Sequence, residues 1–581
     1  MLNTLLKYIG EFKNTAILTP MCMIGEVICE MIIPVLMGRI VDLGIGGSDM
    51  NYIIRTGLIM LAVALMGLLF GILGGVFGAK ASAGFAKNLR KAMHDNIQTF
   101  SFSSIDKFSS SSLVTRLTTD VTNIQNAFQM ILRMAMRAPA SMIIAMVMSF
   151  IISPKLASIY LAAVFLLACV MVIIMRRATK YFQQVFRRYD DLNNSVQENV
   201  SSIRVVKAYV REDYEISKFH KAAENIYEMF IKAEMNIAGV SPIMMTVVYG
   251  CILLISWFGA HLIIGGELQT GQLMSLLAYC MNILMSLMML SVVFVMITMS
   301  EASAKRIAEV IEEKSDLTNP ENPIMEVPDG SIRFEDVDFS YRPGTGDPVL
   351  KDIDLDIASG ESIGIIGGTG SAKSSLVNLI SRLYDVTQGK VIVGGNDVRD
   401  YDLDTLRNQV SVVLQKNVLF SGTILDNLRW GDKDATEEEC RRACQMACAD
   451  EFIQKMPEGY NTWIEQGGSN VSGGQKQRLC IARALLKKPK ILILDDSTSA
   501  VDTATDAKIR KAFREEIPGT TKLIIAQRIS SVKDCDRIIV MDDGRVNGFG
   551  THDELLAGNE IYREVYESQV GGASADFDKK E

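Results

Sequence analysis

The chain has 581 residues, enough for at least two domains, and 49% of them are hydrophobic, with a mean hydropathy of +0.20. That hydropathy is above the usual level of a soluble enzyme, and the long apolar runs all lie before residue 300. The net charge of −8 is mild and no basic stripe is present, which argues against a nucleic-acid partner.

Six apolar segments are long enough to cross about 30 Å of hydrocarbon as helices. Helices are required there because backbone groups in lipid have no water to bond. The segments lie near residues 15–38, 53–78, 129–152, 156–176, 237–263 and 270–298. The sequence therefore predicts an all-α membrane domain over residues 1–300.

The loops between these segments alternate in charge. Residues 39–52 and 263–271 are short and nearly free of Lys and Arg, whereas 79–128 and 177–236 are long and carry many. The positive-inside rule places the long loops in the cytoplasm, together with both termini. We expect these loops to be helical, because structureless loops of such length are uncommon.

Two carboxylates lie inside the first apolar segment, where charge is costly. Glu26 and Glu30 are four residues apart and so share one helix face. In one interpretation they line a substrate cavity and meet a cationic substrate or a proton. In the other they face a wet cavity or pair with a basic side chain such as Arg133 or Arg137. The sequence leaves both interpretations open.

The composition turns soluble in the second half. Residues 301–330 read as a charged helix followed by a linker that contains Pro and Asn. Segments 331–341 and 360–367 have the patterns of strands bounded by turn residues. We expect an α/β domain over 331–568 and a disordered tail over 569–581.

The string GGTGSAKSS follows a predicted strand and opens a helix, which is the context of a phosphate-binding loop. Glycines let backbone N–H groups approach phosphate oxygens, and the helix N-terminus adds positive potential. Lys373 would reach the β and γ phosphates of ATP, and Ser374 would offer its hydroxyl to Mg²⁺. The predicted ATP contacts of the loop are Gly367, Gly368, Thr369, Gly370, Ser371, Ala372, Lys373, Ser374 and Ser375.

One residue of this loop departs from the usual pattern. Ala372 replaces the final glycine, and its methyl group would crowd the loop or restrict its dihedral angles. We expect ATP binding to survive because Lys373 and Ser374 are intact. Further along, a buried apolar strand ends in Asp495, which is placed to hold Mg²⁺, and Tyr341 near a strand end would stack on adenine.

Residues 472–478 read SGGQKQR, and ILILDDSTSAVD follows at 491–502. These motifs follow the phosphate-binding loop in order. With them, the chain resembles one half of an ABC exporter of the multidrug type, and the resemblance covers nearly the whole chain. The resemblance is strongest to the degenerate-site subunit of bacterial heterodimeric multidrug exporters. It implies an α/β P-loop nucleotide-binding domain that stacks head to tail on a second one, with each ATP held between them.

The resemblance also assigns roles to individual positions. The signature residues would contact ATP bound to the partner: Ser472, Gly473, Gly474 and Gln475. Gln415, at the end of the strand expected over 410–415, would meet Mg²⁺ or water, and Asp502 would lie in a loop between the two sites. Residues 101–108 and about 202–212 would form two coupling helices.

Two positions depart from active members of this family. Asp496 stands where a catalytic glutamate is usual, and Gln527 stands where a histidine is usual. Losing a positioned acid–base group costs roughly 10²–10⁴-fold in rate. These changes predict a site that binds ATP and hydrolyses it weakly, beside an intact signature that completes a partner's site. The alternative is that both residues are tolerated variants in a working site.

The predicted function is that of a subunit of an ATP-driven exporter of hydrophobic or amphipathic compounds, in the plasma membrane. Its expected partners are a second, different half-transporter and the lipid bilayer. The alternative is a regulatory ATP-binding subunit of an exporter of a peptide, lipid or siderophore.

Overall fold

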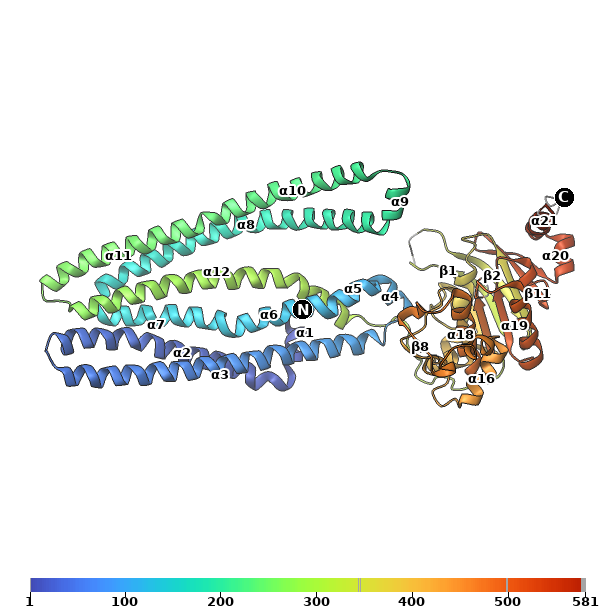
Figure 1. Ribbon diagram of the computed structural model, residues 1–581, viewed down its shortest axis with the longest axis horizontal. Helices are drawn as coiled ribbons and strands as arrows, with labels where there is room; N and C mark the ends of the chain where they lie inside the picture. The colour runs from blue at the N-terminus through green and yellow to red at the C-terminus, as the bar shows by residue number, and fades with distance from the viewer. Residues whose placement is uncertain (1, 343, 345, 498–499, 576–581) are drawn as a thin grey trace. The chain divides into compact units, whose positions relative to one another are not determined.

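The computed structural model describes residues 2–342, 344, 346–497 and 500–575, and it divides into two compact units (Figure 1). Unit 1 comprises Met1–Gln98 and Ser110–Glu313, and unit 2 comprises Thr99–Ser109 and Lys314–Glu581. The boundary at 313 lies inside the linker expected over 301–330. The short segment Thr99–Ser109 belongs to unit 2 although it is far away in the sequence.

Six helical stretches of the described residues are long and apolar enough to cross a membrane. They are Thr4–Ile45, Met50–Ile97, Ser110–Ile152, Pro154–Ile174, Glu212–Ile264 and Thr270–Glu312. Each overlaps one of the segments predicted from hydropathy, and most extend beyond it. The last stretch continues beyond 298, because the charged segment that follows extends the same helix to Glu312.

The helices of unit 1 are α1 (Leu2–Leu6), η1 (Lys7–Phe12), α2 (Lys13–Arg39), η2 (Ile40–Ile45), α3 (Met50–Ile97), α5 (Ser110–Thr115), η3 (Arg116–Asp120), α6 (Val121–Met130), η4 (Ile131–Ala135), α7 (Met136–Ile152), α8 (Pro154–Ser201), α9 (Ile203–Ala208), α10 (Glu212–Ala238), α11 (Val240–Ile264) and α12 (Thr270–Glu312). Local signals explain several helix starts. The Asp49 side chain accepts a hydrogen bond from the Tyr52 N–H at 3.1 Å before α3, and Pro154 opens α8.

The packing of unit 1 follows these helices. α2 packs along α3, α7 and α12, and α8 packs along α10 and α11 (Figure 1). As expected, the long loops are helical, and α9 lies within the second segment assigned to a coupling helix.

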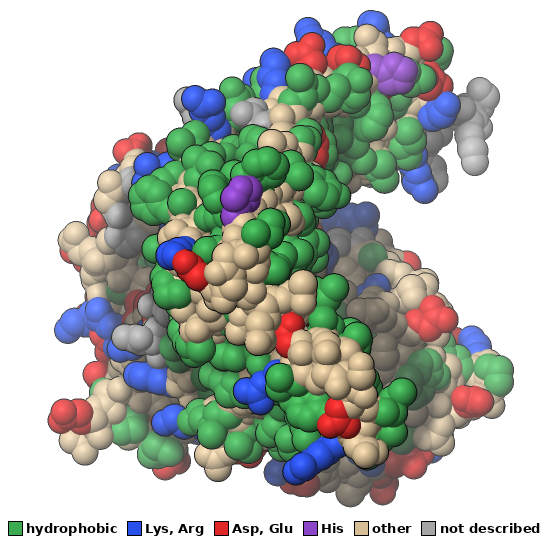
Figure 2. Space-filling model, turned by 90° about the vertical axis from the view of Figure 1, so that its left-hand side faces the viewer, with side chains coloured by type: hydrophobic (Ala, Val, Ile, Leu, Met, Phe, Trp, Pro, Cys, Tyr) green, Lys and Arg blue, Asp and Glu red, His purple; other side chains and the backbone are tan. Residues whose placement is uncertain are grey.

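Unit 1 presents apolar side chains outward. On α3, Leu58, Leu61 and Leu65 are between 56% and 61% exposed. Hydrophobic side chains cover much of the face of unit 1 that is visible in Figure 2. Surfaces of this kind are unfavourable in water and favourable against lipid tails, so the bilayer is the environment these helices require.

Unit 2 contains a six-stranded sheet in the order β12-β11-β3-β10-β9-β6. Its strands are β12 (Arg545–Gly550), β11 (Arg537–Asp542), β3 (Ser362–Gly367), β10 (Thr521–Ile525), β9 (Ile491–Asp495) and β6 (Val410–Val413). All neighbours are parallel except β11 and β12. Because parallel strands are buried on both faces, β9 is a continuous apolar run that ends in one carboxylate.

A second, antiparallel sheet has the order β2-β1-β4-β5, and β7 pairs with β8. These strands are β1 (Ile332–Phe339), β2 (Leu350–Ile357), β4 (Gln388–Val393), β5 (Asn396–Asp397), β7 (Gly422–Thr423) and β8 (Trp463–Ile464). The helices of unit 2 are α4 (Phe102–Phe108), α13 (Lys373–Ile380), η5 (Val398–Asp400), α14 (Leu403–Gln409), α15 (Ile424–Leu428), α16 (Glu437–Met446), α17 (Asp450–Ile453), η6 (Gly459–Asn461), η7 (Gln466–Gly468), α18 (Gly473–Leu486), α19 (Thr503–Glu516), η8 (Ile529–Ser531), α20 (His552–Gly558) and α21 (Glu560–Ala575).

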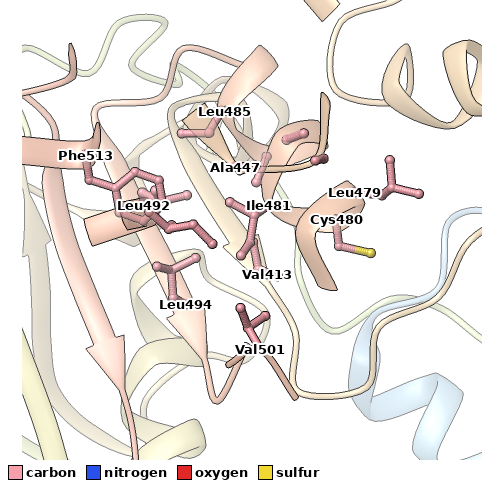
Figure 3. Packing of buried hydrophobic residues seen from close by; sticks show 14 of the residues in the cluster. Val413, Ala447, Leu479, Cys480, Ile481, Leu485, Leu492, Leu494, Val501 and Phe513 are labelled. Atoms are coloured by element: carbon pink, nitrogen blue, oxygen red, sulfur yellow. The ribbon is translucent and has the colours of Figure 1, made fainter. Parts of the chain in front are cut away.

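The main core of unit 2 lies between the six-stranded sheet and its helices. Ile481 and Leu485 of α18 pack with Leu492 and Leu494 of β9 and with Phe513 of α19 (Figure 3). This packing fixes the ends of β9 and α18, where the sequence places its chemical motifs. The last helix, α21, extends to Ala575, where the sequence predicts a disordered tail from 569; residues 576–581 lie outside the described residues.

Candidate nucleotide site and membrane charge cluster

The register of the central strands gathers the motifs at one edge of the sheet. Ile525 of β10 is paired with Asp495 of β9 and with Ile365 of β3. Asp496, which follows β9, and Gln527, which lies two residues beyond the end of β10, are therefore close together. The phosphate-binding loop (367–375), which follows β3, lies beside them. Ligands of open α/β sheets bind at such carboxyl ends of parallel strands.

The loop curls around the ammonium group of Lys373. Its Nζ donates to the carbonyl oxygens of Gly367 at 2.9 Å and Gly368 at 2.8 Å. Burial lowers the pKa of Lys373, while the negative charges of Asp495 and Asp496 act in the opposite direction. A glycine is required at 367, because a Cβ there would lie 2.2 Å from the Met541 carbonyl oxygen.

Ala372 has the left-handed conformation, with φ +68° and ψ 23°, directly before α13. Only glycine adopts this conformation without steric cost, and the cost for an L-residue is about 1–2 kcal/mol. The predicted effect of the methyl group is therefore found as backbone strain. The loop nevertheless keeps the strand–loop–helix form that presents N–H groups to an anion.

The predicted magnesium ligands are only partly brought together. Ser374, in the first turn of α13, lies beside Asp495, which is 6% exposed at the end of β9. Burial raises the pKa of Asp495, and the Ser374 hydrogen bond and the nearby Lys373 charge counteract this rise. Gln415 is exposed in a bend, because β6 ends at Val413 and not at 415 as expected. A hydroxyl and a carboxylate are hard oxygen donors of the kind that Mg²⁺ takes together with waters and phosphates.

The two unusual residues contact each other. Gln527 donates from Nε2 to Oδ2 of Asp496 at 2.9 Å. Asp496 has a positive φ of +50°, and its backbone N–H donates to the carbonyl of Ile525 at 3.1 Å. Both residues line a cavity of about 200 Å³ that extends toward α19.

Tyr341, for which the sequence predicts adenine stacking, lies beside the helix that follows the phosphate-binding loop. The residue is 44% exposed, and its hydroxyl is 2.9 Å from the Ser375 Oγ. It meets Phe339 and Tyr384 edge to face, with ring centroids 4.8 Å and 5.1 Å apart.

The sequence reasoning did not identify Tyr384. Its hydroxyl donates to Oδ2 of Asp106 at 2.7 Å, and its ring contacts Phe102 at 6.0 Å, both on α4. Burial raises the pKa of Tyr384, and the Asp106 hydrogen bond raises it further. The helix expected over 101–108 is thus present and joined to the aromatic group beside the nucleotide loop. Tyr384 follows α13 as a single tyrosine outside any motif, so the sequence around it does not indicate this contact.

The signature residues begin α18. Ser472 is the N-cap: its Oγ accepts from the Gln475 N–H at 3.3 Å, and the Gln475 side chain accepts from the Ser472 N–H at 2.9 Å. Gly473 is exposed, and a Cβ on Gly474 would lie 2.8 Å from the Ala500 carbonyl oxygen. The N-terminus of a 14-residue helix is therefore left open to an anion.

Asp502 caps α19. Its side chain accepts from the Thr505 N–H at 2.9 Å, and this hydrogen bond holds the pKa of Asp502 below its ordinary value. The preceding loop is attached to α18, because the Ala500 N–H donates to Gln477 at 3.0 Å. Asp502 thus has a local structural role at the position where the resemblance implies communication between sites.

In unit 1, both membrane carboxylates pair with one cation. Arg137 of α7 contacts Glu26 through Nη1 at 3.0 Å and Glu30 through Nη2 at 2.9 Å. Of the two interpretations left open by the sequence, pairing with a basic side chain is the arrangement that the structure contains. The group carries a net charge of one negative unit when all three residues are ionised.

An apolar cavity of about 630 Å³ lies elsewhere in unit 1, between α8 and α12. It is lined by Ala168, Met171, Val172, Arg176, Leu287, Leu290, Ser291 and Phe294. The lining residues of each helix recur at three- and four-residue spacing, so one face of each helix forms a wall. Its volume is in the range of sites for drug-sized molecules.

Comparison with known proteins gives consistent matches along the chain. The family described as the ABC transporter transmembrane region matches residues 17–288, and that described as ABC transporter matches residues 350–499. An uncharacterized ABC transporter ATP-binding protein of Bacillus subtilis, YfiB, is 36% identical over 97% of this chain and 98% of its own length. An ATP-dependent lipid A-core flippase of Desulfotalea psychrophila is 32% identical over 83% of this chain and 84% of its own length.

A solved structure of a bacterial Atm1-family ABC exporter with ATP bound has the same fold. The TM-score is 0.80 with 23% identity, over 95% of this chain and 97% of that one. The matches cover both units and agree with the six apolar spans. The chain therefore belongs to the ABC transporter family, as a half-transporter of the exporter type that fuses a multi-pass membrane domain to an ATP-hydrolysing domain.

Proposed function

We propose that this chain is the degenerate-site subunit of a heterodimeric exporter of hydrophobic or amphipathic compounds. Its own ATP site would turn over slowly, and its signature would complete the active site of a different half-transporter. The hydrogen bond between Gln527 and Asp496 is the observation that carries the proposal.

Hydrolysis requires a water held in line with the γ-phosphate and a carboxylate that polarises it. Asp496 is one methylene shorter than glutamate, and one of its oxygens already accepts from the neutral Gln527 amide at 2.9 Å. One carboxylate oxygen of Asp496 is therefore engaged by the loop after β10. An amide cannot take up positive charge as a histidine does, so the site lacks both groups that drive turnover in active members.

ATP binding rests on residues that are intact. Lys373 and the N–H groups at the start of α13 would hold the phosphates, and Tyr341 would stack on the adenine. Mg²⁺, when bound, would neutralise phosphate charge; Ser374 and Asp495 would hold it, directly and through water, and Gln415 would join them if its loop moved inward. The signature is equally intact, with Ser472, Gly473 and Gly474 at the open end of α18.

For transport, we propose that the cavity between α8 and α12 takes part in binding the apolar compound. The Lys- and Arg-rich loops would lie in the cytoplasm of a plasma-membrane protein, together with the nucleotide-binding domain and both termini. α4 and α9 would be the coupling helices, and ATP would bias the protein between two global states.

A lipid is the second candidate substrate. It is favoured by the relation to a lipid A-core flippase and by the composition of the same cavity, in which Arg176 accompanies apolar residues. Arginine at such a position would hold a phosphate or carboxylate headgroup while the chains lie along the helices.

Inverted membrane vesicles that contain this chain and the half-transporter encoded next to it would test the proposal. ATP-dependent uptake of hydrophobic dyes is the expected result, and the same vesicles with a fluorescent anionic lipid test the second candidate. Absence of dye uptake, with the chain folded and ATP consumed, would contradict the multidrug function. Equal uptake by vesicles that hold this chain alone would contradict the need for a partner.

A further inference from the structure

Gln569 on α21 makes two hydrogen bonds to one loop of the nucleotide site. Its Nε2 donates to the backbone carbonyl of Gln527 at 2.9 Å, and its Oε1 accepts from the backbone N–H of Ile529 at 2.9 Å. One side-chain amide thus satisfies a donor and an acceptor two residues apart, as a paired strand would. We call residues 526–531 the switch loop.

The helix that carries Gln569 is itself fixed to unit 2. Tyr562 is completely buried, its hydroxyl lies 2.6 Å from Nδ1 of His552, and its N–H donates to Asn559 at 2.9 Å. Val565 packs against the main core from the next turn. Gln569 therefore reaches the switch loop from an anchored helix.

The far end of the switch loop is held from a different element. Ser531 donates to Oδ2 of the buried Asp506 on α19 at 3.1 Å. Ile529, in the middle of the switch loop, is 2% exposed. At the near end, the backbone carbonyl of Gln527 accepts a side-chain hydrogen bond from Gln569. A side chain of α21 thus contacts the backbone of the residue whose side chain meets Asp496.

We propose that Gln569 is a positioning residue, which sets the backbone of the switch loop at Gln527 and Ile529 and so holds the Gln527 side chain in reach of Asp496. This inference rests on the proposed degenerate site and extends it to the C-terminal helix. It makes α21 part of the nucleotide site although it contributes no group to ATP.

Hydrogen exchange of the full-length chain in nanodiscs tests the contact itself. Gln569→Met keeps the length of the side chain and removes both hydrogen bonds, whereas Gln569→Glu keeps an acceptor for the Ile529 N–H. Because one hydrogen bond contributes modestly, we expect exchange at Ile529 to be about three- to tenfold faster in the Met variant and close to the parent rate in the Glu variant. Glu567→Ala, on the same helix, is the matched control and should leave the rate unchanged.

An unchanged rate in the Met variant, or an equal rise in the Glu567→Ala control, would overturn the proposal. Because exchange is measured without hydrolysis, this result does not depend on whether the site is degenerate. A general loss of fold would accelerate exchange throughout β9 and β10 as well, and would be recognised by that pattern.

A second experiment measures ATP turnover in the chain that carries Asp496→Glu and Gln527→His. This double variant is expected to hydrolyse ATP faster than the unaltered chain. Adding Gln569→Met to it should lower kcat for ATP at least threefold with little change in KM. A purely structural role would instead change KM and stability together, and that outcome would overturn the positioning role. If the repaired chain shows no gain, the degenerate-site proposal fails while the exchange result still decides the contact.

Discussion

The amide Nε2 of Gln527 lies 2.9 Å from the carboxylate Oδ2 of Asp496, so the two residues that carry the proposed degeneracy are hydrogen-bonded to each other. Their proximity follows from the pairing of Ile525 with Asp495, which brings the ends of β9 and β10 together. Asp496 is a short acid, and the neutral amide of Gln527 is hydrogen-bonded to it.

Ala372→Gly should stabilise the protein. Relief of the left-handed strain gains about 1–2 kcal/mol, and the greater freedom of glycine in the unfolded chain offsets about 0.4–1 kcal/mol of it. We expect a net gain of about 0.5–1 kcal/mol, seen as a higher thermal midpoint. Ala372→Val is the matched comparison and should lower the midpoint, because a β-branched residue is worse in this conformation. A lower midpoint for the glycine variant would contradict the strained conformation.

Ser472→Ala should act on the partner's site. The change removes the N-cap of α18, which costs about 1 kcal/mol of local stability. It also removes the hydroxyl that is expected to face the partner's ATP. ATPase activity of the heterodimer should fall at least tenfold, while binding of a fluorescent ATP analogue to this chain's own loop is retained. The corresponding serine of the proposed partner is the control, because it would face the site proposed to be degenerate. If the control substitution were the more harmful of the two, the assignment of the sites would be reversed.

Tyr384→Phe should weaken the link between α4 and the rest of unit 2. The variant keeps the ring contacts with Phe102 and Tyr341 and loses only the hydrogen bond to Asp106. Hydrogen bonds to charged groups contribute about 1.5–3 kcal/mol. We expect transport per ATP hydrolysed to fall at least twofold with ATP binding unchanged. Asp106→Asn should have a similar effect, and the double variant should add little to either.

Arg137→Gln should destabilise the membrane domain, because it leaves Glu26 and Glu30 as neighbouring carboxylates without a cation. Breaking a buried ion pair costs about 3–5 kcal/mol, and the cost here should be smaller because these side chains are 20% to 40% exposed. The thermal midpoint and the yield of monodisperse protein should both fall. Changing Glu26 and Glu30 to Gln in the same chain should restore both. If the triple variant were no better than the single one, unpaired charge would not be the cause.

Much of this architecture is readable from local sequence. Hydropathy located the six spans because length and apolarity are local properties. The phosphate-binding loop and the signature were located because their strand and helix contexts flank the motifs directly. The prediction that β6 extends to 415 was wrong, since the apolar run VSVVL continues past the last paired residue, Val413.

Contacts between distant segments were not readable in the same way. The Asp106–Tyr384 hydrogen bond spans 278 residues, and the Gln569–Gln527 contact spans 42. Neither residue has a neighbouring motif that marks it. For Glu26 and Glu30 the spacing showed a shared helix face, but the choice of Arg137 as partner depends on how α2 packs on α7.

ATP turnover by the purified full-length chain, alone in nanodiscs and compared with its Asp496→Glu, Gln527→His variant, tests the central claim most directly. The account predicts slow hydrolysis by the unaltered chain, although it binds ATP, and a rise of at least tenfold after both changes. Rapid hydrolysis by the unaltered chain, with no gain from the two changes, would contradict it.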